Sequence, residues 1–191
     1  DIWSDGGIVR VCRALAEAGV RKINITGGEP LVRRGVAGLV KALKKQPGID
    51  VVTMTTNGIL LAGLADSLRE AGLDGINISL DALDPDLYRV LTRGGDVRDA
   101  LAGIDAALAC GFPVVKINCV PFANGNGPEV VRIAELARNR LLHVRFIEMM
   151  PLGQGTEFSP LGRETLRCLL ENALGPLAPA AGPAGNGPAE Y

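Results

Sequence analysis

The sequence predicts an α/β fold in which parallel strands alternate with helices and form part of a barrel. Five β-rich runs start at residues 21, 51, 75, 114 and 143, which is 24 to 39 residues apart, and helix-length segments separate them. This spacing is that of βα units, whose neighbouring strands run parallel and are joined by right-handed crossovers. The chain has 191 residues, 47% of them hydrophobic, so it can bury a core without disulfides or a structural metal.

The first expected element is a helix over residues 5–18, because apolar residues recur there at helical spacing and Gly19 can end it. The runs rich in β-branched residues predict strands over 21–26, 51–56, 75–80, 114–120 and 143–149. Between and after them we expect helices over 36–46, 60–71, 86–92, 97–110, 128–140 and 163–173.

Apolar and polar side chains alternate within each expected strand, as in Ile23-Asn24-Ile25 and Val115-Lys116-Ile117. A parallel strand covered on both faces would instead be a continuous apolar run. The alternation favours a barrel with helices outside and a lumen that holds water or a large polar ligand, over an open doubly wound sheet. An antiparallel sheet with one solvated face is the other alternative, and the helix-length connections disfavour it. Five strands are fewer than the eight of a full barrel, so we expect a partial one.

Charge and cysteine usage exclude several classes of protein. Lys and Arg number 20 against 21 Asp and Glu, which argues against a nucleic-acid groove or a polybasic membrane patch. No stretch reaches the roughly 20 apolar residues of a membrane span. The four cysteines lack CxxC or CxxxCxxC spacing, so we predict no metal site in this chain, and we expect structural thiols in a reducing, cytoplasmic compartment. They are Cys12, Cys110, Cys119 and Cys168.

The expected domain organisation is a barrel core over residues 1–174 followed by a linker over 175–191. The last segment, GPLAPAAGPAGNGPAEY, is mostly Gly, Pro and Ala, a composition that does not pack into a core.

Polar motifs stand where the expected strands end, and the carboxyl ends of barrel strands are where active sites lie. They are TGGEP at 26–30, TTNG at 55–58, SLD at 79–81, KIN at 116–118 and EMMP at 148–151. In the first motif, Gly27 and Gly28 let the backbone approach a ligand, Glu29 offers a carboxylate and Pro30 ends the strand.

The string INITGGEPLVRRG resembles the turn that holds S-adenosylmethionine (SAM) in radical SAM enzymes. Together with TTNG, NISLDALDPDLYRVLTRGG, VKINCVP and VRFIEMMPLG, in this order, it resembles the GTP 3′,8-cyclases of molybdenum cofactor biosynthesis over about residues 11–153. This resemblance implies a partial (βα)6 TIM-like barrel, truncated here to about five parallel strands. It also implies a lyase that uses SAM and two [4Fe–4S] clusters to convert GTP to 3′,8-cyclo-7,8-dihydro-GTP.

Matched position by position, the resemblance implies that Gly28, Ser79 and Met150 contact SAM and that Thr55 and Lys116 contact GTP. Structural alternatives stay open. Ser79 could satisfy only backbone, Thr55 could be an ordinary strand residue, and Met150 could act through its backbone. Lys116 could pair with an acidic side chain, Asp81 or Glu148, instead of a triphosphate.

Further site residues are expected beside these. Gly27 and Glu29 share the turn of Gly28, and Arg145 lies on the polar side of its strand as a second phosphate partner. Asn24 stands where the resemblance implies an arginine facing GTP, which replaces a charge-assisted contact by a neutral one. Asn126-Gly127 departs from the family's Asn followed by an acidic residue.

Both cysteine motifs of the family are absent, so we expect the first strand and cluster loop upstream of Asp1 and the second cluster's ligands downstream of Tyr191. The chain alone is therefore predicted to be inactive. Expected partners of the whole enzyme are GTP, SAM and an electron donor protein, with a homodimer left open and neither nucleic acid nor membrane. The alternatives are another radical SAM enzyme that modifies peptides or cofactors, and a non-catalytic nucleotide-binding βα module. A structural role is expected for the one histidine, His143.

Overall fold

Five strands form a sheet in the order β1 to β5, and the pairings of β1 with β2, β2 with β3 and β4 with β5 are parallel. The expected α/β fold class is therefore confirmed. This computed structural model describes residues 3–150 and 158–179. The strands are β1 (Lys22–Ile25), β2 (Val51–Thr56), β3 (Gly75–Ser79), β4 (Val114–Cys119) and β5 (His143–Phe146). The chain divides into unit 1, Asp1–Ile78 with Arg98–Val115, and unit 2, Ser79–Val97 with Lys116–Tyr191.

All the expected helices are present, with two differences. The helix expected over 60–71 is a 3-10 turn, η2 (Leu61–Gly63), followed by α3 (Ala65–Glu70), and the one expected over 128–140 ends early as α6 (Glu129–Glu135). In the described part of the chain, the structure contains no helix with the length and apolarity needed to cross a membrane. The remaining helical elements are α1 (Asp5–Glu17), η1 (Pro30–Val32), α2 (Val36–Lys44), α4 (Pro85–Leu91), α5 (Val97–Ala109) and α7 (Arg163–Leu174).

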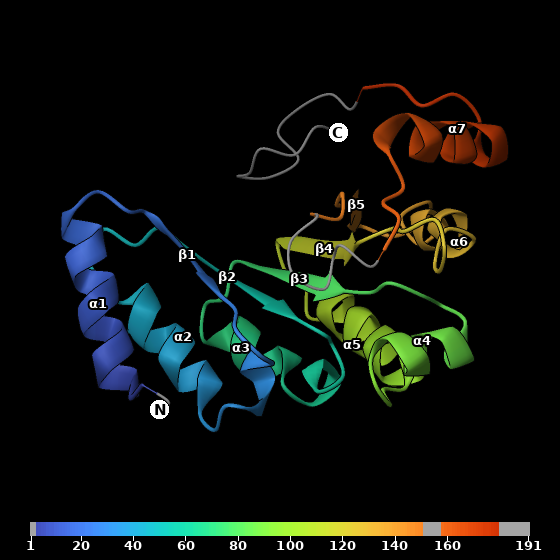
Figure 1. The fold of residues 1–191 in the computed structure, drawn as a ribbon. Helices are drawn as coiled ribbons and strands as arrows, with labels where there is room; N and C mark the ends of the chain where they lie inside the picture. The colour runs from blue at the N-terminus through green and yellow to red at the C-terminus, as the bar shows by residue number, and fades with distance from the viewer. Residues whose placement is uncertain (1–2, 151–157, 180–191) are drawn as a thin grey trace. The chain divides into compact units, whose positions relative to one another are not determined.

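In unit 1, helices α1, α2, α3 and α5 lie on one face of β1, β2 and β3 (Figure 1). The apolar side chains of the strands are the buried ones: Val52, Met54, Ile76 and Ile78 are at most 1% exposed. Their polar neighbours in β2, Thr53 and Thr55, are half-buried. The alternation read from the sequence thus corresponds to one face under helices and one polar face.

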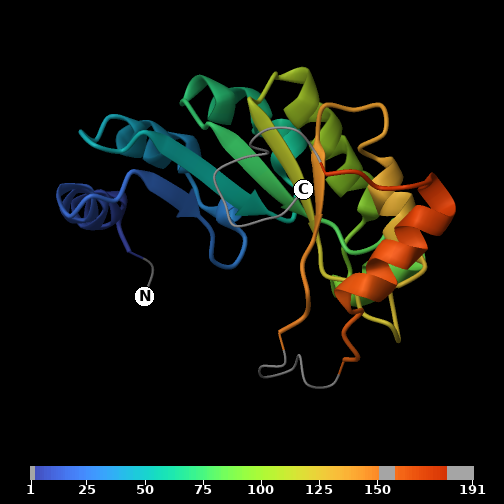
Figure 2. The ribbon, with the colours of Figure 1, turned by 90° about the horizontal axis from the view of Figure 1, so that it is seen from above.

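Unit 2 has a core of its own between α6, β5 and α7, and α7 lies alongside α6 (Figure 2). The core consists of Val130, Leu161 and Leu170, with Ala134, Phe146, Leu166 and Leu174 packed against it.

The strand expected over 143–149 is shorter in the structure, because its partner β4 ends at Cys119, opposite Phe146. Beyond Phe146, the Ile147 amide adds one more hydrogen bond, to the Cys119 carbonyl.

The four cysteines, expected to be structural thiols, differ in their exposure. Cys12 and Cys119 are buried, and the half-buried Cys110 thiol lies 3.0 Å from an Asp66 carboxylate oxygen. Cys168 is exposed because α7 turns the residues 166, 170 and 174 toward the core and residue 168 toward solvent.

The expected linker begins directly after α7, whose last residue is Leu174. Residues 175–179 form neither helix nor strand, and residues 180–191 lie outside the described residues. The boundary between barrel core and linker therefore stays a prediction.

Helix α5 approaches the turn after β2 closely at two glycines. A Cβ on Gly103 would lie 2.3 Å from the carbonyl oxygen of Gly58, and one on Gly58 would lie 2.9 Å from a methyl carbon of Ile78. Gly58 also has a φ of +81°, which side-chain-bearing residues rarely adopt. The turn that follows β2 is thus held against α5 by backbone contact.

We predict that Gly103→Ala lowers the free energy of unfolding by about 1–3 kcal/mol, because the added methyl overlaps a backbone carbonyl that cannot rotate away. Gly38→Ala is the matched control. Gly38 is an exposed glycine inside α2 with no atom within 4 Å of an added Cβ, so its replacement should stabilise the protein by up to about 1 kcal/mol. Urea unfolding followed by circular dichroism measures both, and an unchanged or raised stability of Gly103→Ala would contradict the close approach.

Candidate functional site

The turn after β1 exposes its backbone. Gly27 has a φ of +142°, and a Cβ on either Gly27 or Gly28 would meet nothing within 4 Å. A hollow of about 640 Å³ lies beside this turn, and apolar residues such as Ile8, Ile25 and Leu39 make up much of its lining together with Gly28. Both glycines are exposed, so their amide and carbonyl groups are open to a polar ligand.

Glu29 connects this turn to the end of β2. One carboxylate oxygen accepts hydrogen bonds from the Leu31 amide at 2.9 Å and the Thr56 hydroxyl at 2.6 Å, and the other accepts from the Asn57 amide at 2.8 Å. Both oxygens are thus engaged by the chain itself. Glu29 therefore holds the glycine turn against the end of β2. The predicted direct contact of Glu29 with SAM stays a prediction.

On the polar face of unit 1, uncharged side chains form a network beside the exposed Lys22 of β1. The Thr55 hydroxyl oxygen accepts from the amide groups of Asn24 at 3.2 Å and Asn77 at 3.3 Å, and Thr53 donates to Asn24 at 2.9 Å. A hydroxyl has two acceptor sites and one proton, so Thr55 can still donate that proton to a ligand. The structure thus brings together the predicted GTP contacts Thr55 and Asn24.

The polar face of unit 2 is cationic. Lys116 pairs in register with His143, and Asn118 with Arg145, whose guanidinium donates to the Asn118 side-chain oxygen at 3.0 and 2.7 Å. Lys116 is only 6% exposed. Burial, and then the charges of Lys116 and Arg145, lower the pKa of His143, so at neutral pH the histidine stays neutral beside the two cations. This face favours an anion such as a phosphate group.

The other two predicted SAM contacts are accessible. Ser79 is the last residue of β3 and is exposed, and Met150 is 70% exposed. Both can therefore reach a ligand.

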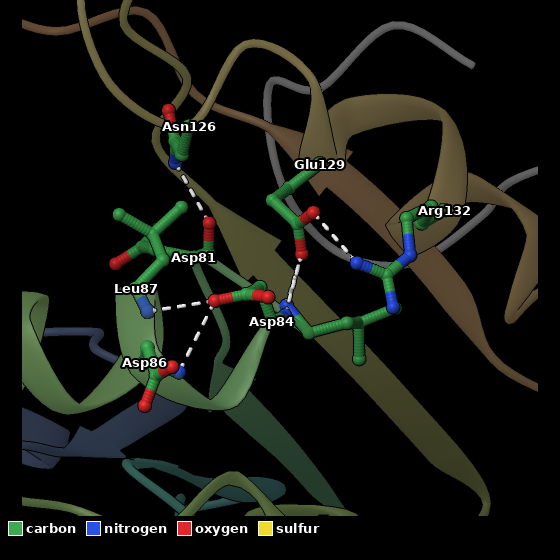
Figure 3. A network of polar contacts seen from close by, with 8 residues as sticks. Asp81, Asp84, Asp86, Leu87, Asn126, Glu129 and Arg132 are labelled. Atoms are coloured by element: carbon green, nitrogen blue, oxygen red, sulfur yellow. Dashed lines mark hydrogen bonds and ion pairs between the residues drawn. The ribbon is translucent and has the colours of Figure 1, made fainter.

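Three polar side chains that the sequence did not single out as site residues connect the loops after β3 and β4 (Figure 3). Asn126 is fully buried, and its amide donates to the carbonyls of Asp81 at 2.9 Å and Val120 at 3.1 Å. The Asp81 carboxylate accepts from the Val120 amide at 2.8 Å. The signal in the sequence was a polar residue inside the glycine-rich run NGNGPE, which was read only as a departure from the family.

Glu129, at the start of α6, completes this connection. One carboxylate oxygen accepts from the Leu83 amide at 2.5 Å and the Asp84 amide at 2.8 Å, and the other accepts from Arg132 at 2.8 Å. Asp84 in turn caps α4 by accepting from the amides of Asp86 and Leu87 (Figure 3).

Burial and hydrogen bonding shift the pKa values of these groups in opposite directions. Burial raises the pKa of Asp81, which the Val120 amide offsets only in part. Burial would also raise the pKa of Glu129, but the bonds from Leu83, Asp84 and Arg132 outweigh it and lower that pKa. Burial, and then the charges of Asp81 and Glu129, strongly raise the pKa of the Cys119 thiol, which therefore stays protonated.

Across residues 3–150 and 158–179, no group of three or more His, Cys, Asp or Glu side chains could hold a metal ion. What the described arrangement offers is an open glycine turn, neutral hydroxyl and amide donors, and a cationic strand face.

Because the pKa of Glu129 is lowered in the folded state, its ionisation stabilises the fold above the unfolded pKa of about 4.3, and this contribution is lost as the pH falls through the folded value. We therefore predict that Glu129→Gln is less stable than the original protein at pH 7, and that the difference shrinks below about pH 4. Urea unfolding at a series of pH values measures it. A difference that stays constant down to pH 3 would contradict this assignment.

Comparison with known proteins identifies the family of the chain. The Radical SAM superfamily matches residues 4–137. The chain is 48% identical over 188 residues to a GTP 3′,8-cyclase of Pelotomaculum thermopropionicum and 45% identical over 186 residues to one of Moorella thermoacetica. These alignments cover 96% and 95% of this chain but only 58% and 57% of the relatives, so the chain spans a little over half of their length.

Solved structures show the same fold at low identity. The maturase HydG of [FeFe]-hydrogenase aligns with a TM-score of 0.68 at 14% identity, over 91% of this chain and 43% of its own. Methylornithine synthase aligns with a TM-score of 0.61 at 18% identity, over 76% of this chain and 44% of its own. Since the superfamily match spans well over half of the residues of this chain, the chain belongs to the radical SAM superfamily.

Proposed function

We propose that this chain is the core of a GTP 3′,8-cyclase, a lyase that converts GTP to 3′,8-cyclo-7,8-dihydro-GTP in molybdenum cofactor biosynthesis. The observation that carries the proposal is the cationic face of unit 2, where the nearly buried Lys116 lies in the same strand pair as Arg145. Lys116 and Arg145 bring two positive charges to one strand pair, and the triphosphate of GTP is an anion that two such cations can bind. The relatives of 45–48% identity are named for this activity.

The residues proposed for SAM fit a polar ligand. Gly28 offers open backbone, as does Gly27 beside it, while Ser79 offers an exposed hydroxyl and Met150 an exposed backbone and side chain. Glu29 holds the glycine turn in place through its bonds to β2. When bound, SAM supplies the 5′-deoxyadenosyl radical that removes a hydrogen atom from the substrate.

The residues proposed for GTP differ between the two units. Lys116 and Arg145 supply positive charge in unit 2, whereas Thr55 and Asn24 supply a hydroxyl and an amide in unit 1. Asn24 is held by Thr53 and Thr55, so it offers a neutral contact where the resemblance implied a guanidinium. The proposal therefore places the triphosphate on the unit 2 face.

The two [4Fe–4S] clusters do not fit the residues described here, because those residues contain no group of metal-ligating side chains. We place the cluster ligands in the whole protein outside this chain. The proposed whole enzyme also takes electrons from a donor protein, acts in the cytoplasm and can form a homodimer.

An anaerobic assay of the full-length protein with GTP, SAM and dithionite tests the activity. We expect 5′-deoxyadenosine and a cyclised nucleotide in comparable amounts, measured by liquid chromatography with mass spectrometry, and neither product from residues 1–191 alone. If 5′-deoxyadenosine forms without a cyclised nucleotide, the protein is another radical SAM enzyme. If reconstitution with iron and sulfide gives no cluster absorption, the non-catalytic nucleotide-binding module is favoured.

Lys116→Gln in the full-length protein should raise the KM for GTP by about 10- to 100-fold, the equivalent of losing a charged hydrogen bond of about 1.5–3 kcal/mol. The apparent affinity for SAM should change less than threefold. Lys45→Gln, a change of the same kind at an exposed position after α2, is the control and should leave both unchanged. Equal KM values for Lys116→Gln and the original protein would remove Lys116 from the phosphate site.

A further inference from the structure

The loops after β3 and β4 are tied together by three side chains that act on backbone groups. We call Asp81, Asn126 and Glu129 the loop staple. Asp81 and Asn126 connect the first residues of the two loops, and Glu129 reaches from α6 to the amides of Leu83 and Asp84. All of these residues belong to unit 2.

Two of the three staple residues are buried and Asp81 is half-buried. Asn126 is fully buried, and Glu129 is 5% exposed. The Asn126 side chain also accepts from the Phe122 amide at 2.8 Å, so its carbonyl oxygen and its NH2 group are both engaged. Removing the Asn126 side chain would take away the partner of the Phe122 amide and of the Asp81 and Val120 carbonyls. Removing the Glu129 side chain would take away the partner of the Leu83 and Asp84 amides.

The staple lies next to the residues proposed to hold the two ligands. Ser79 is two residues before Asp81, and the intervening Leu80 amide donates to the Asn118 carbonyl at 2.9 Å. Asn118 is two residues after Lys116 on β4, and Val120, which bonds Asp81, is two residues further. A short, continuous path of hydrogen bonds therefore fixes Ser79 with respect to Lys116.

We propose that Asp81, Asn126 and Glu129 are positioning residues, which hold Ser79 and Lys116 at a fixed separation so that SAM and GTP meet in one productive geometry. The inference rests on the proposed function. Reactions between bound partners are sensitive to position, and a misplacement of about 1 Å can cost about 100-fold. Weakening the staple should leave the contacts of each ligand in place. It should allow 5′-deoxyadenosine to form while less cyclised nucleotide is made.

The test measures the ratio of cyclised nucleotide to 5′-deoxyadenosine in the reconstituted full-length enzyme with dithionite as reductant. Glu129→Ala should lower this ratio at least about fivefold. Glu129→Gln keeps an oxygen that can accept from Leu83 and Asp84, so it should restore the ratio to within about twofold. Glu135→Ala, the same change at an exposed residue of the same helix, is the matched control.

A purely structural role would reduce the amount of folded enzyme and lower both products together, leaving their ratio unchanged. Hydrogen–deuterium exchange supplies a readout that does not depend on activity: the amides of Leu83 and Asp84 should exchange faster in Glu129→Ala than in Glu129→Gln. Equilibrium binding of GTP should differ less than threefold among these variants. If Glu129→Ala does not fold, Glu129→Asp, which withdraws the carboxylate by one methylene, takes its place with the same expected direction.

The outcomes separate the two proposals. If the original enzyme forms no cyclised nucleotide, the proposed function fails, and so does this assignment of the staple. The second case is that the original enzyme forms the cyclised nucleotide, and the Leu83 and Asp84 amides exchange faster in Glu129→Ala or Glu129→Asp, but the product ratio is unchanged. This result overturns the positioning role while the proposed function stands.

Discussion

The alternation of apolar and polar residues along parallel strands is the constraint on which the rest of this structure depends. Each strand places its apolar side chains on one face, as Val52 and Met54 do in β2, and its polar side chains on the other. Polar groups on a sheet face need partners or solvent. In unit 1 Asn24 bonds Thr53 and Thr55 on a face that also carries the exposed Lys22, and unit 2 presents the cations Lys116 and Arg145.

A second feature is that single polar side chains, buried or half-buried, hold the turns at the carboxyl ends of the strands. Glu29 holds the glycine turn to the end of β2, and Asn126 and Glu129 hold the loop after β3. The carboxylates of Glu29 and Glu129 accept from backbone amides of these loops, and the NH2 group of Asn126 donates to the Asp81 carbonyl. Such bonds fix loops that have no regular secondary structure, which is what a ligand site at a sheet edge requires.

The strands and helices could be predicted from the sequence because their periodicity is local, and most ends agree within a few residues. The exceptions depend on tertiary partners. Strand β5 stops at Phe146 because β4 ends opposite it, and Cys168 is exposed because α7 packs through its 166, 170 and 174 positions. The alternation of positions along each strand was also enough to predict which residues share a polar face.

The loop contacts could not be predicted in the same way. Glu129 bonds residues 45 and 46 positions earlier in the chain, and no periodic pattern records such a pairing. The sequence also does not reveal that the Glu29 oxygens accept bonds from Leu31, Thr56 and Asn57, while the predicted contact of Glu29 with SAM stays a prediction. A short motif shows that a turn is special without showing which atoms it uses.

The proposed cyclase activity requires that the ribose of GTP meets the radical derived from SAM. The most direct measurement uses GTP deuterated on its ribose with the full-length enzyme, SAM and dithionite, followed by mass spectrometry of the 5′-deoxyadenosine. The account predicts that one deuterium is transferred to 5′-deoxyadenosine alongside formation of a cyclised nucleotide. Formation of 5′-deoxyadenosine without deuterium would contradict it.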